Sequence, residues 1–440
     1  MSLRLVTCFV TLIFFCNSQV FAQDYKLEQL TLNSAAELFS NNSHELIIAK
    51  HIIESSQADA ITAGQTPNPI LSLGLSNFNL NRSQGNTNPN GSNSLADKTL
   101  NNTIQINQLF ERGGKRKLRL ASAENAIKAT KYDFKDVLRQ QRLALADSYY
   151  DLMLAQDSEK IQASNVDLYE KTSQAAELRY KAGDIAFSDV ARIHVDMLRG
   201  KNDLLQSIAN HQKAQSNLAY LIGREKEAII IVASDDWPKI ELSQGNLELA
   251  STDALSFDNK LDQRADVLAA EARIQQAEQN RLIANALTSR DVDIGIQYQH
   301  FPGQEPVVGT NTLGVSVTIP LFTNYQYQGE IARAEVDFSA AVEAKEQARA
   351  AAVSEITRAQ ADLNASLKKV RRFDEEMLTE AQKSANATEF AYQHGAIGVT
   401  DLLDSRRVLR ALQLDAVSAR ADYAKSLAAW QASTNTEKSQ

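Results

Sequence analysis

The residues best suited to do chemistry in this sequence are charged side chains beside a turn that occurs twice. Asp401 and Asp404 stand three positions apart at the predicted start of a helix, so their carboxylates share one face. In the first copy of the turn, Arg192 occupies the position equivalent to Asp404. A guanidinium there could bond a carboxylate of the other copy, and such an exposed pair contributes only about 0–1 kcal/mol. The chemistry predicted is reversible ion pairing. The alternative is that Arg192 lies on the outer surface of the helices and pairs with nothing.

Other constellations that could do chemistry are absent from the sequence. Both cysteines, Cys8 and Cys16, lie near the N-terminus, and there is no His-Glu-x-x-His motif and no glycine-rich phosphate loop. His44 and His51 are seven positions apart on one helical face, but two polar residues on a wet face explain them better than a metal pair. We predict no catalytic residue, no cofactor and no resident metal.

The two copies of the turn have a constant spacing. Gly183 and Gly395, and likewise Asp189 and Asp401, are 212 positions apart (395 − 183 and 401 − 189). Each glycine can close a helix in the left-handed conformation. A repeat at one long spacing indicates a duplicated architecture.

The helix that follows each turn has its own start signal. Ser188 and Thr400 can cap its free N–H groups, and Asp189 and Asp401 then lie at its positive end. A plain helical hairpin would use the same signals, so one copy alone would indicate no more than that.

Composition points to an exported protein. Residues 1–22 are typical of a secretory signal, with Arg4 before an apolar stretch and Ala22 at the end, and they contain both cysteines. The bulky Phe15 argues against a lipid anchor on Cys16. No later stretch is long and apolar enough for a transmembrane helix. The formal net charge of −8 argues against nucleic acid as a partner.

Residues 23–223 are predicted to form a first structural repeat. A helical pattern over 27–64 ends at a Pro-Asn-Pro run, and two alternating strands follow at about 69–78 and 101–110. A loop rich in Asn, Ser and Gly joins them. From Lys115 to Ala182 there is neither proline nor glycine, which predicts a helix about 100 Å long. A helix over about 189–222 completes the repeat.

Residues 224–256 are predicted to be a linker or small side segment, and 257–430 a second repeat of the same plan. Its helices are expected over about 262–288, 330–394 and 401–430, its strands at about 291–300 and 312–322. Residues 431–440 form a polar tail.

The four strands are apolar on one face and polar on the other, which suits a sheet between lipid and water. Four strands cannot close a barrel, and an open edge in lipid is forbidden. The barrel must therefore be shared. Two copies would give a filled barrel of eight strands, and three copies would give twelve strands and a channel.

In this plan the chain resembles the TolC-like outer membrane efflux proteins over nearly its whole mature length. Two stretches resemble the CzcC-like branch, which serves cobalt–zinc–cadmium efflux: the run from Gln108 to Arg116 and the run from Ala391 to Arg407. The resemblance implies a homotrimer whose twelve-stranded outer-membrane β-barrel continues into a periplasmic α-helical barrel. It also implies a periplasmic membrane-fusion adaptor and an inner-membrane RND transporter as partners, besides outer-membrane lipid.

The resemblance further implies a periplasmic gate. Asp401 and Asp404 match the carboxylates of the closing constriction, and Tyr392 and Asp189 match further members of that network. A well-studied member has an arginine where this chain has Ile397, so we expect Arg192 to replace it.

The two turns are expected to form the tip that docks the adaptor. The docking residues would be Gly183, Ile185, Phe187, Gly395, Ile397 and Val399. The apolar ones among them are expected to lie exposed at an otherwise wet tip, as on a partner surface.

A basic cluster follows the second strand. Lys115, Arg116, Lys117 and Arg119 are expected where the barrel meets the periplasm. They could pair with anionic lipid or with acidic groups, although simple solvation is the interpretation that we favour.

The function predicted is that of an exit duct for divalent heavy-metal cations in a tripartite RND-type efflux system. The alternative within the family is a TolC-like duct for drugs or secreted proteins. A periplasmic helical-hairpin adaptor is the competing class, and the four two-faced strands count against it.

Overall fold

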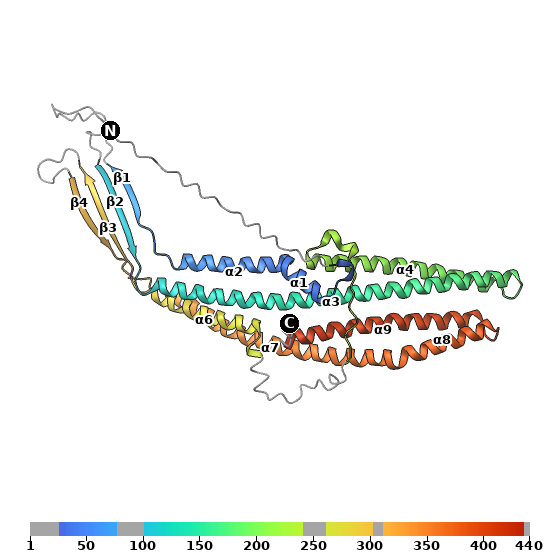
Figure 1. Ribbon diagram of the computed structural model, residues 1–440. Helices are drawn as coiled ribbons and strands as arrows, with labels where there is room; N and C mark the ends of the chain where they lie inside the picture. Colours follow the sequence, from blue (N-terminus) through green and yellow to red (C-terminus); the bar gives the residue numbers. More distant parts are fainter. Residues whose placement is uncertain (1–25, 77–100, 241–260, 302–310, 435–440) are drawn as a thin grey trace, which may run out of the picture.

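The computed structural model describes residues 26–76, 101–240, 261–301 and 311–434. The predicted signal peptide, the loop over 79–100 and parts of the predicted linker and tail lie outside these residues. The chain is mainly helical and elongated, with a small sheet at one end and the turns of two helical hairpins at the other (Figure 1).

The sheet contains four antiparallel strands in the order β1-β2-β3-β4. They are β1 (Ile70–Ser76), β2 (Asn101–Phe110), β3 (Val292–His300) and β4 (Asn311–Thr318). The register aligns the apolar positions across all four strands, so that Leu71, Ile106, Ile296 and Val315 form one row. Gln105, Gly295 and Ser316 belong to the opposite, polar face.

The N-terminal helical pattern is not one helix. It divides into η1 (Leu27–Gln29), α1 (Leu32–Asn42) and α2 (His44–Ala63). Ser43 has an extended backbone (φ −60°, ψ 121°) that separates α1 from α2. This break lets α1 lie across the first hairpin while α2 runs back toward the sheet (Figure 1).

The first hairpin consists of α3 (Lys115–Lys181), an uninterrupted helix of 67 residues, and α4 (Phe187–Ile222). Gly200 does not break α4, because it faces α3 and lies 3.6 Å from Tyr169 and Val166 where a Cβ would stand. Gly223 ends α4 in the left-handed region, at φ 67°.

The second repeat begins with α6 (Ala265–Ala286), and its hairpin consists of three further helices and a π-helical stretch. These are α7 (Gln328–Arg372), η4 (Phe373–Met377), α8 (Leu378–Gln393) and α9 (Val399–Thr434). The prediction of an unbroken α-helix over 330–394 is therefore wrong at η4, whose five residues are wound more widely.

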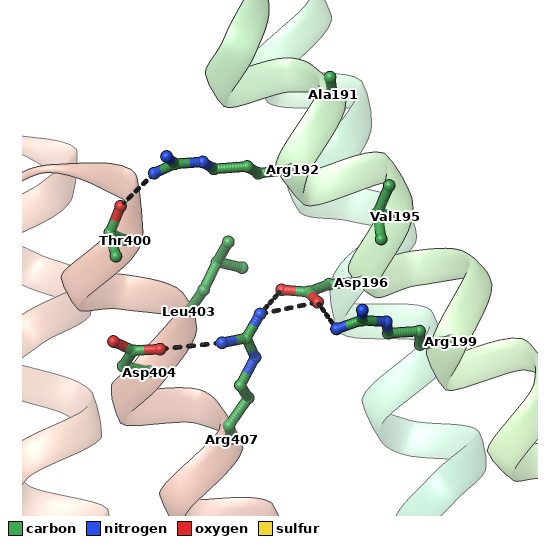
Figure 2. Close-up of a pocket in the computed structure, with 9 residues that line it drawn as sticks. All are labelled: Ala191, Arg192, Val195, Asp196, Arg199, Thr400, Leu403, Asp404 and Arg407. Atoms are coloured by element: carbon green, nitrogen blue, oxygen red, sulfur yellow. Dashed lines mark hydrogen bonds and ion pairs between the residues drawn. The ribbon is translucent and has the colours of Figure 1, made fainter.

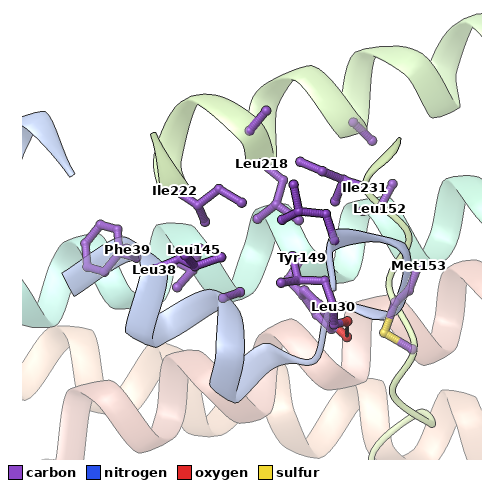
Figure 3. Packing of buried hydrophobic residues seen from close by; sticks show 14 of the residues in the cluster. Leu30, Leu38, Phe39, Leu145, Tyr149, Leu152, Met153, Leu218, Ile222 and Ile231 are labelled. Carbon is purple, nitrogen blue, oxygen red and sulfur yellow. Dashed lines mark hydrogen bonds between the residues drawn. The ribbon is translucent and has the colours of Figure 1, made fainter. Parts of the chain in front are cut away.

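The largest core lies midway along the molecule (Figure 3). Phe39, Leu145, Leu218 and Ile222 bring α1, α3 and α4 together. The buried Tyr149 hydroxyl donates to the Leu30 carbonyl at 2.8 Å and lies 2.9 Å from Asp235 Oδ2. Burial raises the pKa of Tyr149, so this hydroxyl keeps its proton.

The residues after α4 are packed onto this core. The short helix η2 (Glu225–Ile230) is followed by the buried Ile231, and the Trp237 ring stacks on Tyr150. The described part of the predicted linker is thus attached to the first repeat. Among the described helices, none combines the length and hydrophobicity of a membrane span.

Candidate functional site

The two hairpin turns lie together at the end opposite the sheet (Figure 1). Gly183 and Gly395 adopt φ 83° and 75°, the left-handed conformation that the sequence predicts. The next N–H reaches back across each turn: Asp184 N donates to Arg179 O and Ala396 N to Ala391 O, each at 2.9 Å. Both helices therefore end in the same glycine-dependent motif.

The helices after the turns start earlier than predicted. Ala186 is the N-cap of α4 and no side chain caps it, so Ser188 lies inside the first turn. Helix α9 begins at Val399, which places Thr400 inside its first turn. The prediction that Ser188 and Thr400 are N-caps is therefore wrong. Packing decides the start instead, because Val399 is buried and the Phe187 ring lies 5.9 Å from that of Tyr180.

A small apolar core stabilises the tip. Tyr169, Ile193, Val399 and Leu403 are buried there, and Ile185 and Tyr392 pack against them. Phe187 is 66% exposed, as expected of a docking residue, whereas Val399 is only 5% exposed. The expectation of an exposed Val399 is wrong, because its side chain joins the two hairpins.

Beside this core, a groove of about 510 Å³ runs between α4 and α9 (Figure 2). Arg192 reaches across it from α4, and its Nη1 donates to the Thr400 hydroxyl at 2.8 Å. Arg192 thus links the two hairpins, but the expected bond to a carboxylate is absent among the described residues. The acceptor is a hydroxyl and not the expected carboxylate of Asp401 or Asp404, both of which are exposed.

A second link crosses the groove one helical turn farther from the tip. Arg407 donates to both oxygens of Asp196, at 2.7 and 2.8 Å, and to Asp404 Oδ1 at 2.9 Å (Figure 2). The Asp196 side chain is 5% exposed, and Arg199 approaches it only to 3.9 Å. The hydrogen bonds to Asp196 raise the pKa of Arg407, so the guanidinium stays charged. Two-point bonding to a buried carboxylate makes this the strongest link in the groove.

Sequence reasoning missed Asp196, Arg199 and Arg407. Asp196 follows Arg192 by four positions on the same face of α4, and this spacing could have indicated it. Arg407 lies inside the run shared with the resembling family. Their pairing could not be predicted, because it depends on how two hairpins far apart in the sequence lie side by side.

The other predicted gate residues form no hydrogen bond or ion pair across the groove among the described residues. The Tyr392 ring lies 5.2 Å from the Arg179 guanidinium. Among the described residues, the Asp189 and Asp401 side chains have no bonded partner. Beyond the groove, farther from the tip, Arg410 donates to Asp203 at 3.0 Å, again from α9 to α4. The site is thus a row of polar links between two hairpins.

The described residues contain no group of three or more His, Cys, Asp or Glu side chains arranged to hold a metal ion. His51 lies 2.8 Å from Glu54 and so pairs within its own helix. What the tip can do chemically is make and break hydrogen bonds and ion pairs.

Comparison with known proteins fits this architecture. The sequence profile described as "Outer membrane efflux protein" matches residues 35–224 and 257–436. The chain belongs to the outer membrane efflux protein family. As a member, it is an efflux channel protein of the outer membrane, with a long helical extension into the periplasm.

This efflux protein has similar sequences among named proteins. It is 22% identical to the cobalt-zinc-cadmium resistance protein CzcC of Cupriavidus metallidurans, over 86% of this chain and 84% of that one. It is 24% identical to the outer membrane protein TolC of Escherichia coli, over 81% and 72%. Among solved structures, the outer membrane protein VceC of Vibrio cholerae has a TM-score of 0.72 at 21% identity, covering 92% and 95%.

Proposed function

We propose that this efflux protein is one subunit of a homotrimeric exit duct, in which three sheets complete a twelve-stranded barrel. The sheet's uncovered apolar face carries this proposal. Its large apolar side chains are 38–76% exposed, so one subunit leaves them unburied. They are Leu71, Leu73, Leu75, Ile104, Ile106, Ile294, Ile296, Tyr298, Leu313, Val315 and Val317. Acyl chains are the surroundings in which such a face is stable.

The two edge strands of the sheet require edge strands of further copies as partners. Within the described residues, strands β1 and β4 each pair on one side only. In a membrane the free N–H and C=O groups of both edges must be bonded, and a closed ring of copies does this. Three copies supply twelve strands, enough to leave a channel.

The helical hairpins then form the periplasmic tunnel, with the turns at its far end. In this arrangement the groove between α4 and α9 is part of the gate. Arg192, Tyr392, Asp189, Asp401 and Asp404 remain the proposed gate residues from the sequence. Arg407 and Asp196 join them, since they make the strongest link between the hairpins.

The exposed part of the tip is the proposed adaptor surface. Phe187 is 66% exposed there, with Ile185 and Ile397 half-buried beside Gly183 and Gly395. A periplasmic adaptor would dock on this surface and connect the duct to an inner-membrane RND transporter. Val399 has no place in the docking surface, because it is buried.

The proposed cargo is a divalent heavy-metal cation. The similarity to CzcC supports this cargo, and the two motif runs named above support it too. The similarity to TolC equally fits a duct for drugs or secreted proteins, which is the second candidate. In either case a conduit works best when it binds its cargo weakly.

Three experiments test these proposals. Native mass measurement in detergent should give a trimer, and a stable monomer would refute the shared barrel.

The cargo is tested by expressing the chain with its genomic neighbours in a host that lacks its own channels. Tolerance of cadmium and zinc should rise while tolerance of organic antibiotics stays constant; the reverse result would favour the second candidate. Release from membranes without detergent would favour the adaptor class.

A further inference from the structure

The junction between sheet and helices concentrates cations in an otherwise acidic chain. Arg112 stands two residues after the end of β2 and three before the start of α3 at Lys115, and Arg290 stands two residues before β3 at the same junction. The two segments touch, because Arg112 N donates to Asp291 Oδ1 at 2.9 Å. The whole chain has a formal net charge of −8, so this local excess of positive charge runs against its composition.

Two acidic residues of the junction, Glu111 and Asp291, are already paired with cations. Asp291 is bound by the buried Lys115 at 2.8 Å, and Glu111 is bound by Arg119 at 2.6 and 2.9 Å. In contrast, Arg112, Lys117 and Arg290 are exposed, and none of them has an acidic partner within 4.0 Å among the described residues. Within the described part of the chain these three cations have no counter-ion, and neither does the exposed Arg116, which instead donates to the Gly64 carbonyl at 2.6 Å.

Two of these cations continue the apolar face of the sheet. Phe110 pairs with Val292 in the last rung of the β2–β3 ladder, and Ile106 pairs with Ile296 farther along. Arg112 and Arg290 follow this last rung by two positions, outside the ladder itself, and the alternation of the strands assigns these positions to the apolar face. The column of side chains therefore changes from apolar to cationic at the junction.

Aromatic side chains mark the same level. Arg290 lies 5.5 Å from the centre of the Phe322 ring, which packs edge-on against Tyr327 at 5.3 Å. Tyr325 and Leu321 are 54% and 74% exposed beside them. Tyrosine next to arginine or lysine at the end of an apolar band is typical of a membrane–water interface.

We propose that Arg112, Arg290 and Lys117 bind the phosphate headgroups of anionic phospholipids in the periplasm-facing leaflet. This inference rests on the proposed placement of the sheet in the membrane. The charges complement the ligand, and the cationic level is continuous with the exposed apolar face that would contact the acyl chains. A lipid therefore satisfies both halves of the surface, whereas a soluble phosphate satisfies only the cations.

The test uses the full mature protein in nanodiscs that contain equal amounts of phosphatidylglycerol and phosphatidylcholine. Lipids retained by each subunit are counted by native mass spectrometry. Wild type should retain phosphatidylglycerol preferentially, and Arg112→Gln with Arg290→Gln should lower that preference about fivefold for each cation removed. The matched control is Lys160→Gln with Lys171→Gln, two exposed positions in the half of α3 nearer the turn, which removes the same charge and should leave the preference unchanged.

Two further measurements separate lost charge from misfolding and a lipid from a soluble phosphate. Arg112→Lys with Arg290→Lys should restore the preference, which a misfolded protein would not do. Millimolar glycerol phosphate should not displace the lipid; displacement would identify a soluble phosphate site and overturn the inference. If wild type inserts but retains both lipids equally, the proposed lipid site is overturned, while the proposed duct is unaffected. Failure to insert would instead refute the duct.

Discussion

The two hairpins have the same plan, yet only one of them is wound uniformly. In the first, α3 runs for 67 residues without interruption. In the second, 45 residues of α7 and 16 of α8 are separated by the five residues of η4. The ends still correspond, because Lys181 and Gln393 are 212 positions apart, as the glycines of the turns are. The second hairpin therefore contains a wide turn that the first lacks.

The surroundings of η4 explain why a wide turn is tolerated there. Phe373 is buried with Tyr423 and Leu367 in a small core, and Asp374 accepts from Arg420 at 2.6 Å. Fifteen buried residues form the core around Tyr149 in the first repeat, against seven around Phe373. Because π-turns have poorer backbone bonding, we expect the second hairpin to be the one that bends.

The largest effect should come from deleting one residue at equivalent positions of the two long helices. A π-turn accommodates an extra residue, so deleting Glu375 should restore regular α-helix with both flanks in phase. Deleting Ala163, which stands 212 positions earlier, should rotate the rest of α3 by about 100° and withdraw Tyr169 from the tip core.

The trimer yield and thermal midpoint of both deletion variants decide this comparison. The Glu375 deletion should assemble and show slower hydrogen exchange over 373–378, whereas the Ala163 deletion should fail to assemble. Equal tolerance of both deletions would mean that η4 is no structural difference between the hairpins.

The next effect concerns the ion pairs that join the two repeats. Arg264, 4% exposed, lies 2.9 Å from Asp266 and 2.8 Å from Glu355, which also accepts from Arg139 of α3 at 2.7 Å. Burial opposes ionisation of Glu355, but the bonds and charges of Arg264 and Arg139 outweigh it and hold the pKa of Glu355 below its ordinary value. The stabilisation is therefore present above the ordinary pKa and is lost as pH falls through the lowered one.

We expect the thermal midpoint of wild type to fall as the pH drops below about 4. Glu355→Gln should have a lower thermal midpoint than wild type at neutral pH, and its midpoint should fall less than that of wild type on acidification. The profile of Glu375→Gln, a matched change on the exposed side of η4, should follow that of wild type. Parallel profiles for all three proteins would show that Glu355 does not join the repeats.

A smaller effect is expected at the groove. Arg407→Ala leaves the buried Asp196 with only the distant Arg199, which should destabilise the closed tip by about 2 kcal/mol and raise the open probability more than tenfold. Single-channel recording in planar bilayers measures this. Arg199→Ala is the control, because Arg199 is 71% exposed and 3.9 Å away. Similar conductance of both variants would exclude Asp196 from the gate.

The smallest effect should follow Arg192→Ala. Its bond to Thr400 is exposed and joins a charge to a neutral hydroxyl, so about 0.5–1 kcal/mol is at stake and the open probability should rise a few-fold. Thr400→Val should reproduce the change, and Asp401→Ala should not. A larger effect of Asp401→Ala would mean that Arg192 bonds the carboxylate in the assembled duct.

The sequence by itself determined the periodic features of this protein. Alternation at 71–75 and 313–317 predicted the two-faced strands, and the absence of glycine and proline after Lys115 predicted the long helix. The repeated Gly183 and Gly395 predicted both turns, since their left-handed backbone depends on a residue without a Cβ. Local sequence patterns are sufficient to predict these elements, because each depends on the backbone preferences of neighbouring residues.

Only the tertiary structure decided the contacts between the repeats. The pairing of Arg407 with Asp196, the burial of Val399 and the start of α9 before Thr400 depend on which faces of α4 and α9 meet. The wide turn at Phe373 likewise follows from packing against Tyr423, because Asp, Glu and Met in that stretch all permit an ordinary helix. Side chains more than 200 positions apart meet only when the hairpins pack side by side, and no local pattern specifies that lateral register.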